Sequence, residues 1–522
     1  MNEKEIAWDK APDGSVRVND YNLGEIKQLL NSVGPGFCLA KWNQVTLHLG
    51  RGHTHSCHHP ASHKIPLAEL AKNPSALHNT EFKKQQRKTM LEGNRPEECD
   101  YCWRNEDENN WSDRQYKSME YWALDDYDYI SKKLNGNEDV YPKYMEVSFG
   151  NTCNQKCTYC GPESSSQWVS EIKKNGPIKV LEGTNNEQWT HGWQDDLDSF
   201  NYKNNEHNPY IDAFWEWWPE AYKHLKVFRI TGGEPLLSKE TFKIIDWMTE
   251  HRNPDLEFHI NSNLNVPDET WNKFIKKIEV LKDSSNINNF SLYTSVEGWG
   301  ERAEYARTGL DFKKFKQRYE QVIGMGNVRC VIMATYNIFS VTSFKSLLEW
   351  QLGLRKKYNC NPSVRNVENA GWHTRKGKSN LELYEFNSNH KSVVGIDIPY
   401  LRHPIMLDAH ICTHDLVEKY MIPNLNFLAS NISELHWWNH QGFETYEFEK
   451  FRRIILHRLF YNQPKDNPLD DRKDLIVLRA KFYDFINQID KRNDSSFINT
   501  FPEMKHFYDM CEKAYSNERK KI

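Results

Sequence analysis

The chain has 522 residues, a formal net charge of −4 and a sequence pI near 6.6. This length exceeds one typical hydrophobic core and predicts two or three domains. The near-neutral charge gives no general attraction to nucleic acid or to anionic membranes, although local nucleic-acid binding is not excluded. The first residues lack a basic segment followed by an apolar one, and no stretch approaches about eighteen apolar residues, so we expect a cytoplasmic protein without a membrane span.

Four cysteines in the first hundred or so residues form a possible metal site: Cys38, Cys57, Cys99 and Cys102. Four thiolates complete the coordination of an iron–sulfur cluster. Five histidines crowd around the second of these cysteines: His53, His55, His58, His59 and His63. Because imidazole and thiolate together also suit zinc, we predict a 4Fe-4S cluster on the four cysteines and keep a mixed Cys/His zinc site as the alternative.

A second set of cysteines follows a strand-like segment that ends near residue 149. Cys153, Cys157 and Cys160 have the spacing C-x3-C-x2-C, with Tyr159 in the last gap. Three thiolates on one loop can hold three irons of a 4Fe-4S cluster and leave the fourth iron open to a small molecule. Structural zinc requires four ligands, usually in two pairs, and fits this triplet poorly.

Further along the chain, a predicted strand from residue 226 ends in Gly232, Gly233, Glu234 and Pro235. Between the cysteine triplet and this strand we expect a helix over residues 165–172 and then an insertion or loop over residues 178–210, which are polar and rich in Asn and Asp. Glycines at a strand end let the backbone approach a ligand closely. Glu234 can accept hydrogen bonds from a protonated amine.

The cysteine triplet together with the Gly-Gly-Glu-Pro motif resembles the radical S-adenosylmethionine (radical SAM) enzymes. The resemblance implies that SAM binds the open iron and that Gly232 to Pro235 lie against its amino group. It also implies that an electron donor such as flavodoxin or ferredoxin reduces the cluster, which cleaves SAM to methionine and a 5′-deoxyadenosyl radical. That radical abstracts hydrogen from a substrate, so the cofactor performs the difficult step.

Strands and helices alternate after this point. The expected strands cover residues 256–260, 290–296, 328–334 and 395–398, and the expected helices cover residues 239–251, 270–281, 312–323 and 343–358. Such alternation is typical of a parallel α/β sheet. With the resemblance, it predicts an α/β fold with a partial (β/α) barrel over residues 140–410, a cluster-binding module over 1–130 and a helical region over 411–522, where Leu475, Leu478, Phe482, Phe485 and Ile486 have helical spacing.

Polar residues at the carboxyl ends of these strands are predicted to bind the cofactor, because ligands gather there in parallel α/β folds. They are Asn261, Asn263, Ser295, Glu297 and Asn337. By resemblance they contact the ribose, carboxylate and adenine of SAM. Arg307 is a further candidate for the SAM carboxylate, because a guanidinium suits bidentate pairing. The alternative for each residue is an ordinary cap, turn or surface charge.

The segment from Met90 to Cys102, followed by Glu106, resembles the twitch/SPASM-type auxiliary-cluster domains. In the better-known members that domain follows the barrel, whereas here it precedes it. Cys330, Cys360, Cys412 and Cys511 are isolated and are interpreted as ordinary thiols.

Relatives with auxiliary clusters often modify peptides or proteins, so we expect a peptide or protein substrate. An RNA substrate is the second hypothesis, because residues 83–88 include four basic side chains. A non-catalytic iron–sulfur or zinc-binding interaction module is the third. Beyond the cluster, the sequence assigns no catalytic residue.

Overall fold

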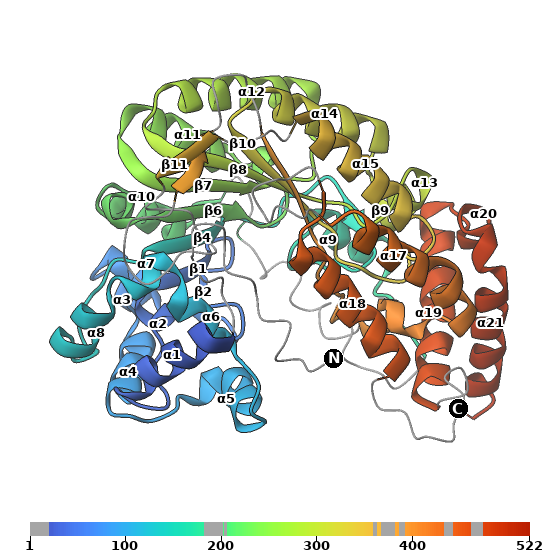
Figure 1. The fold of residues 1–522 in the computed structure, drawn as a ribbon, viewed down its shortest axis with the longest axis horizontal. Coiled ribbons are helices and arrows are strands. Elements are labelled where there is room, and N and C mark those ends of the chain that lie inside the picture. The colour runs from blue at the N-terminus through green and yellow to red at the C-terminus, as the bar shows by residue number, and fades with distance from the viewer. Residues whose placement is uncertain are drawn as a thin grey trace.

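The computed structural model describes residues 20–181, 202, 206–358, 363–366, 382–385, 392–432, 442–460 and 473–521. Its centre is a nine-stranded sheet (Figure 1). From edge to edge the strands are β13 (Val393–Asp397), β10 (Val328–Met333), β8 (Ile287–Ser295), β7 (Asn253–Asn261), β6 (Val227–Thr231), β4 (Tyr144–Ser148), β1 (Gln44–His48), β2 (His53–His55) and β3 (His63–Lys64). The first seven are mutually parallel, and the last two add an antiparallel edge.

Helices join the parallel strands in chain order, so the predicted α/β alternation is confirmed. They are α9 (Ser166–Asn175) and α10 (Pro209–Ala221) before β6, then α11 (Lys239–Glu250), α12 (Asp268–Asp283), α14 (Phe312–Gly324) and α15 (Phe344–Tyr358). Side chains cap three of these helices: Asn208 accepts from the Tyr210 amide at α10, Ser238 from the Glu240 amide at α11, and Asp311 from the Lys314 amide at α14. Most of the stretch predicted as an insertion, 178–210, lies outside the described residues.

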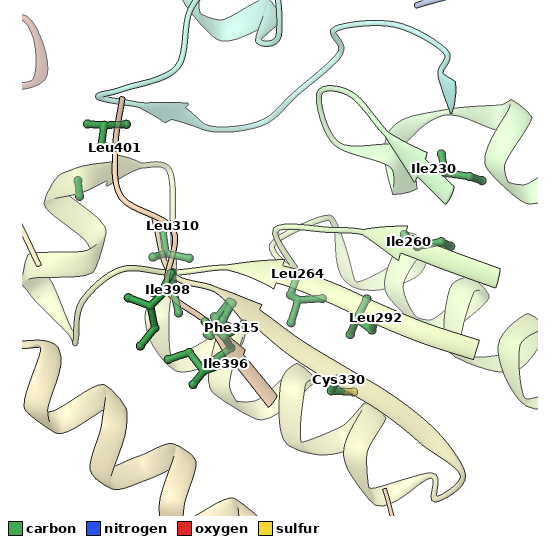
Figure 2. Close-up of a cluster of buried hydrophobic side chains, with 14 of the residues drawn as sticks. Ile230, Ile260, Leu264, Leu292, Leu310, Phe315, Cys330, Ile396, Ile398 and Leu401 are labelled. Carbon is green, nitrogen blue, oxygen red and sulfur yellow. The ribbon is translucent and has the colours of Figure 1, made fainter. Parts of the chain in front are cut away.

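The two faces of the sheet differ in chemistry. One face carries Val147, Ile230, Ile260, Leu292 and Cys330, which are neighbours in register on five strands and are all fully buried. Figure 2 shows four of these side chains together with others of the same core. The residues between them alternate to the opposite face. On that opposite face, the row of neighbouring residues that crosses the middle of the strands is polar: Thr46, Glu146, Arg229, His259, Ser291 and Arg329.

The described residues of the N-terminal part, from residue 20 on, add eight α-helices and their own core, and they share the central sheet. The helices are α1 (Asp20–Asn31), α2 (Ala40–Asn43), α3 (Leu67–Leu70), α4 (Glu81–Leu91), α5 (Asp100–Asp107), α6 (Asp113–Met119), α7 (Tyr121–Leu124) and α8 (Tyr127–Lys133). Phe37, Trp42, Trp103 and Trp122 are buried in their core. Strand β1 pairs in parallel with β4 over five residues, so the two parts form one continuous sheet.

The C-terminal part is helical, as expected, with α16 (His414–Leu416), α17 (Ile422–Ser430), α18 (Thr445–Phe460), α19 (Lys473–Asn493), α20 (Phe497–Thr500) and α21 (Lys505–Arg519). Helix α19 packs on α21 and buries Leu475, Phe482, Phe485 and Ile486, as their spacing predicts. Short elements complete the fold: β5 (Lys156–Cys157), α13 (Glu301–Ala306), β9 (Arg307–Thr308), β11 (Ser363–Asn366) and β12 (Glu382–Glu385). None of the helices in the described ranges has the length and apolar run that a membrane crossing requires.

Candidate functional site

The cysteine loop and the Gly-Gly-Glu loop lie directly against each other at the carboxyl ends of β4 and β6. The Gly233 amide donates to the Gly150 carbonyl at 3.2 Å, and the Glu234 amide donates to the Thr152 carbonyl at 2.7 Å. A Cβ atom on Gly233 would lie 2.3 Å from the Thr152 oxygen. Gly232 has φ +114°, in the region that favours glycine. The close approach of the two loops therefore requires both glycines.

The middle of the cysteine loop is fixed from the other side. Strand β5 pairs with β9, so that Cys157 lies opposite Arg307. The Thr158 amide donates to the Ala306 carbonyl at 2.9 Å, and the buried indole of Trp168 donates to the Cys157 carbonyl at 2.9 Å. Hydrogen bonds to three separate elements thus hold the loop in one conformation.

The three thiols of this loop are close enough to influence one another. Burial raises the pKa of Cys153 to about 11. Burial, together with the neighbouring Cys157 and Cys153, raises the pKa of Cys160. Burial also raises the pKa of Cys157, although the adjacent Arg307 opposes that shift. Grouped, desolvated thiols of this kind favour a bound cation or cluster, which stabilises the thiolate forms.

Arg307 connects the cysteine loop to the end of β8. Its Nε and Nη2 donate to the two carboxylate oxygens of Glu297 at 2.8 and 2.5 Å, and its Nη1 lies 3.4 Å from the Cys157 sulfur. The Tyr159 hydroxyl donates to Glu297 at 2.5 Å. The structure therefore brings four predicted site residues together, but the guanidinium already has an internal carboxylate partner.

Glu234 joins the ends of β6 and β7. Its carboxylate accepts from the Ser262 hydroxyl at 2.9 Å and from the Asn263 amide at 2.7 Å. Burial raises the pKa of Glu234 to about 7. The Asn263 side chain donates to the Asn154 side chain at 2.8 Å and lies 4.0 Å from the Cys153 sulfur.

The other predicted cofactor residues have different environments. Asn261 accepts from Arg229 at 3.0 Å, and Ser295 ends β8 half-buried. Pro235 is buried in the turn after Glu234. The fully buried Asn337 accepts from the Phe339 amide and donates to the Thr335 carbonyl, each at 2.9 Å. Both side-chain amide atoms of Asn337 therefore form hydrogen bonds within its own turn, which agrees with the alternative interpretation of this residue as an ordinary cap.

The four N-terminal cysteines meet around one cavity. Cys38, Cys57, Cys99 and Cys102 line it, as do Lys41, Arg114 and Lys117. Burial and the nearby Cys38 raise the pKa of Cys57, and the same two causes raise the pKa of Cys102 to about 12. The predicted set is therefore assembled by three separate segments of the sequence, around residues 38, 57 and 99–102.

The histidine rings near Cys57 have contacts other than its sulfur, and one nitrogen of His55 contacts the Cys57 carbonyl. His53 contacts the Ser62 hydroxyl at 3.2 Å, His55 contacts His48 at 3.0 Å, and His63 contacts the Thr80 hydroxyl at 3.1 Å. His59 pairs with Asp113, and none of these five rings lines the four-cysteine cavity in the part of the chain that the structure describes. Within the same residues no group of three or more His, Cys, Asp or Glu side chains is arranged to hold a metal ion.

A polar chamber lies between the N-terminal part and the polar face of the sheet, and our sequence reasoning missed it. His58, Lys117 and Glu120 line one side, and Arg229, Glu257 and His259 line the other. The Tyr121 hydroxyl donates to Glu257 at 3.1 Å and ties α7 to the sheet. The signal was present in the sequence, because β6 and β7 each carry a charged or titratable residue in the middle of an apolar strand.

The C-terminal helices brace the cysteine loop, which also was not predicted. Lys156 donates to Glu171 at 2.6 Å, and Arg492 of α19 lies 3.4 Å from the same carboxylate. Asn493 donates to Thr308 at 3.0 Å, next to Arg307.

Comparison with known protein families, with curated proteins and with solved structures gives no match for this chain.

Proposed function

We propose that the chain is a radical SAM enzyme whose cysteine triplet holds a 4Fe-4S cluster with one open iron. The observation that carries the proposal is the direct contact between the triplet loop and the Gly-Gly-Glu loop at the carboxyl ends of parallel strands. A cluster needs ligands that lie near one another without converging on a single ion, because each thiolate binds a different iron. The grouped thiols of Cys153, Cys157 and Cys160 suit that requirement.

The chain's own residues then position and protect the reacting groups. When bound, the cluster and SAM supply a 5′-deoxyadenosyl radical that abstracts hydrogen from a substrate. Arg307 places positive charge beside the Cys157 sulfur, and Glu297 fixes the orientation of that guanidinium. Glu234 and Asn263 present hydrogen-bonding groups at the adjoining strand ends. The same proposal includes the partial (β/α) barrel that the sequence analysis expected for the parallel strands.

The substrate is proposed to enter the polar chamber, and a peptide or protein substrate remains our first choice. The chamber presents Lys117 and Arg229 together with Glu120 and Glu257. Both signs of charge suit a ligand that carries amine and carboxylate groups, as peptides do. The reaction on that substrate is not assigned.

The RNA alternative loses its supporting observation. Two of the four basic side chains in residues 83–88 are buried, since Lys83 is 1% exposed and Arg87 is not exposed at all. Lys84 pairs with Asp139 at 2.7 Å. This segment therefore presents little free positive charge to phosphates.

The first test is anaerobic reconstitution with iron and sulfide, followed by reduction in the presence of SAM. We expect the native chain to release 5′-deoxyadenosine and the Cys157→Ala variant to release none above background, because removing one thiolate leaves the cluster without a ligand. Cys330→Ala is the matched control, since Cys330 is a buried thiol on the apolar face of the sheet. An iron-loaded native protein that never cleaves SAM would instead indicate a non-catalytic module.

A further inference from the structure

Four buried cations surround the four-cysteine cavity. Lys41, Lys83, Arg87 and Arg114 are each at most 2% exposed. Lys41 and Arg114 line the cavity itself. Lys83 donates to the Thr54 hydroxyl at 3.0 Å, three residues before Cys57, and Arg87 donates to the Lys41 carbonyl at 3.2 Å.

Only two of these cations have a carboxylate partner. Arg114 pairs with Glu106 at 2.7 Å, and Lys41 pairs with Glu98. Among the described residues, no carboxylate lies within ion-pair distance of Lys83 or Arg87. The side-chain partners of Arg87 are Asn79 at 2.8 Å and His78 at 3.0 Å, and neither carries negative charge.

A buried cation that has no carboxylate at ion-pair distance is unfavourable in a fold unless other anions lie nearby. The thiols of Cys38, Cys57, Cys99 and Cys102 form anions when they bind a cluster, and Asp113 is a carboxylate that lines the same cavity. Four thiolates around a [4Fe-4S]2+ core carry a net charge of −2, which nearby buried cations stabilise. One-electron reduction adds a further negative charge to the cluster, and nearby cations stabilise that state.

We propose that Lys83 and Arg87 are the counter-charges of a tetrathiolate 4Fe-4S cluster at Cys38, Cys57, Cys99 and Cys102, and that they raise its reduction potential. The inference rests on the proposed cluster at these cysteines but not on SAM cleavage at the triplet. It assigns to α4 a role in setting the redox properties of the N-terminal site. It also predicts opposite effects of Lys83 on the empty and the loaded protein.

The test uses the full chain carrying Cys153→Ala, Cys157→Ala and Cys160→Ala, so that only the N-terminal site can take up iron and sulfide. In this background Lys83→Met should lower the midpoint potential, measured by redox titration with EPR detection, by about 59 mV, which is a tenfold change for a one-electron couple. Lys88→Met is the matched control on the same helix, because Lys88 has a 47% exposed side chain and should leave the potential unchanged.

Thermal unfolding gives a second measurement. Before loading, Lys83→Met should raise the melting temperature, because it removes a buried charge that has no carboxylate at ion-pair distance. After loading, that gain should disappear or reverse. An unchanged potential, zinc in place of iron, no metal uptake, or a loss of stability in the metal-free variant would each overturn the inference. Failure of the native chain to cleave SAM would count against the proposed function alone.

Discussion

At the residue scale, Arg307 illustrates why residue type and position predict a site better than a role. Arg307 follows β8 in the sequence, and its Nη1 lies 3.4 Å from the Cys157 sulfur of the cysteine loop. The predicted role, pairing with a ligand carboxylate, competes with the two hydrogen bonds to Glu297. Sequence spacing could not reveal this pair, because the partner's orientation depends on the tertiary fold.

His63 provides a test of electrostatics at a single residue. Burial, followed by Lys83, Lys41, His53 and His55, lowers its pKa to about 3, from an ordinary value near 6.5. The unfolded chain therefore binds more protons than the folded chain between these values, so the free energy of unfolding should fall as pH decreases from about 6.5 toward 3.

The variant His63→Gln removes this titration. We expect its melting temperature, measured without metal, to decline less steeply with acid than that of the native chain. His251→Gln is the control, since that ring is exposed and contacts the nearby Trp247 carbonyl through Nδ1, at 2.9 Å, at the end of α11. Parallel acid profiles for the native chain and His63→Gln would contradict the assignment.

At the scale of elements, the local sequence predicted the strands β6, β7, β8, β10 and β13 and the helices between them, but not the N-terminal helices α1 to α8. The helix expected over residues 270–281 is α12, Asp268–Asp283, and the strand expected over 328–334 is β10, Val328–Met333. Apolar periodicity determines such elements because one face of each packs on the core. The pairing of β1 with β4 was not predictable in this way, since it joins segments about one hundred residues apart.

The contact between the cysteine loop and the Gly-Gly-Glu loop can be tested with one methyl group. In Gly233→Ala the new Cβ would lie 2.3 Å from the Thr152 oxygen, so the two loops must separate. We expect the iron bound by the triplet to fall at least several-fold, measured by iron and sulfide analysis of a variant that also lacks Cys99.

Gly150→Ala is the matched control, at the glycine of the cysteine loop whose carbonyl accepts from the Gly233 amide. A Cβ at Gly150 has no atom within 4 Å, and the residue does not have a positive φ. Its iron content should equal that of the parent protein. If both variants lost iron equally, the two loops would tolerate no added side chain at either glycine. The close approach of Gly233 to Thr152 would then not explain the loss.

At the scale of the whole molecule, the N-terminal part covers the polar face of the sheet. It is attached at one edge through β1 and contacts the middle of the sheet through Tyr121 and Glu257. It also reaches the segment after β13, where the Arg402 guanidinium lies 5.7 Å from the Tyr101 ring centroid. Tyr101 lies between Cys99 and Cys102, so the segment after β13 comes close to the four-cysteine site.

A fragment of residues 140–522 tests this architecture. Removing β1 leaves the backbone groups of β4 unpaired and uncovers the chamber, and an exposed parallel edge with apolar Met145 and Val147 promotes association between chains. We expect the fragment to be insoluble or to form large oligomers in size-exclusion chromatography with light scattering. Co-expression of residues 1–139 as a separate chain should restore soluble material, because it supplies β1 to the same edge. A monomeric, cooperatively unfolding fragment would instead show that the sheet is complete without β1, and that the N-terminal part is an independent domain docked beside it.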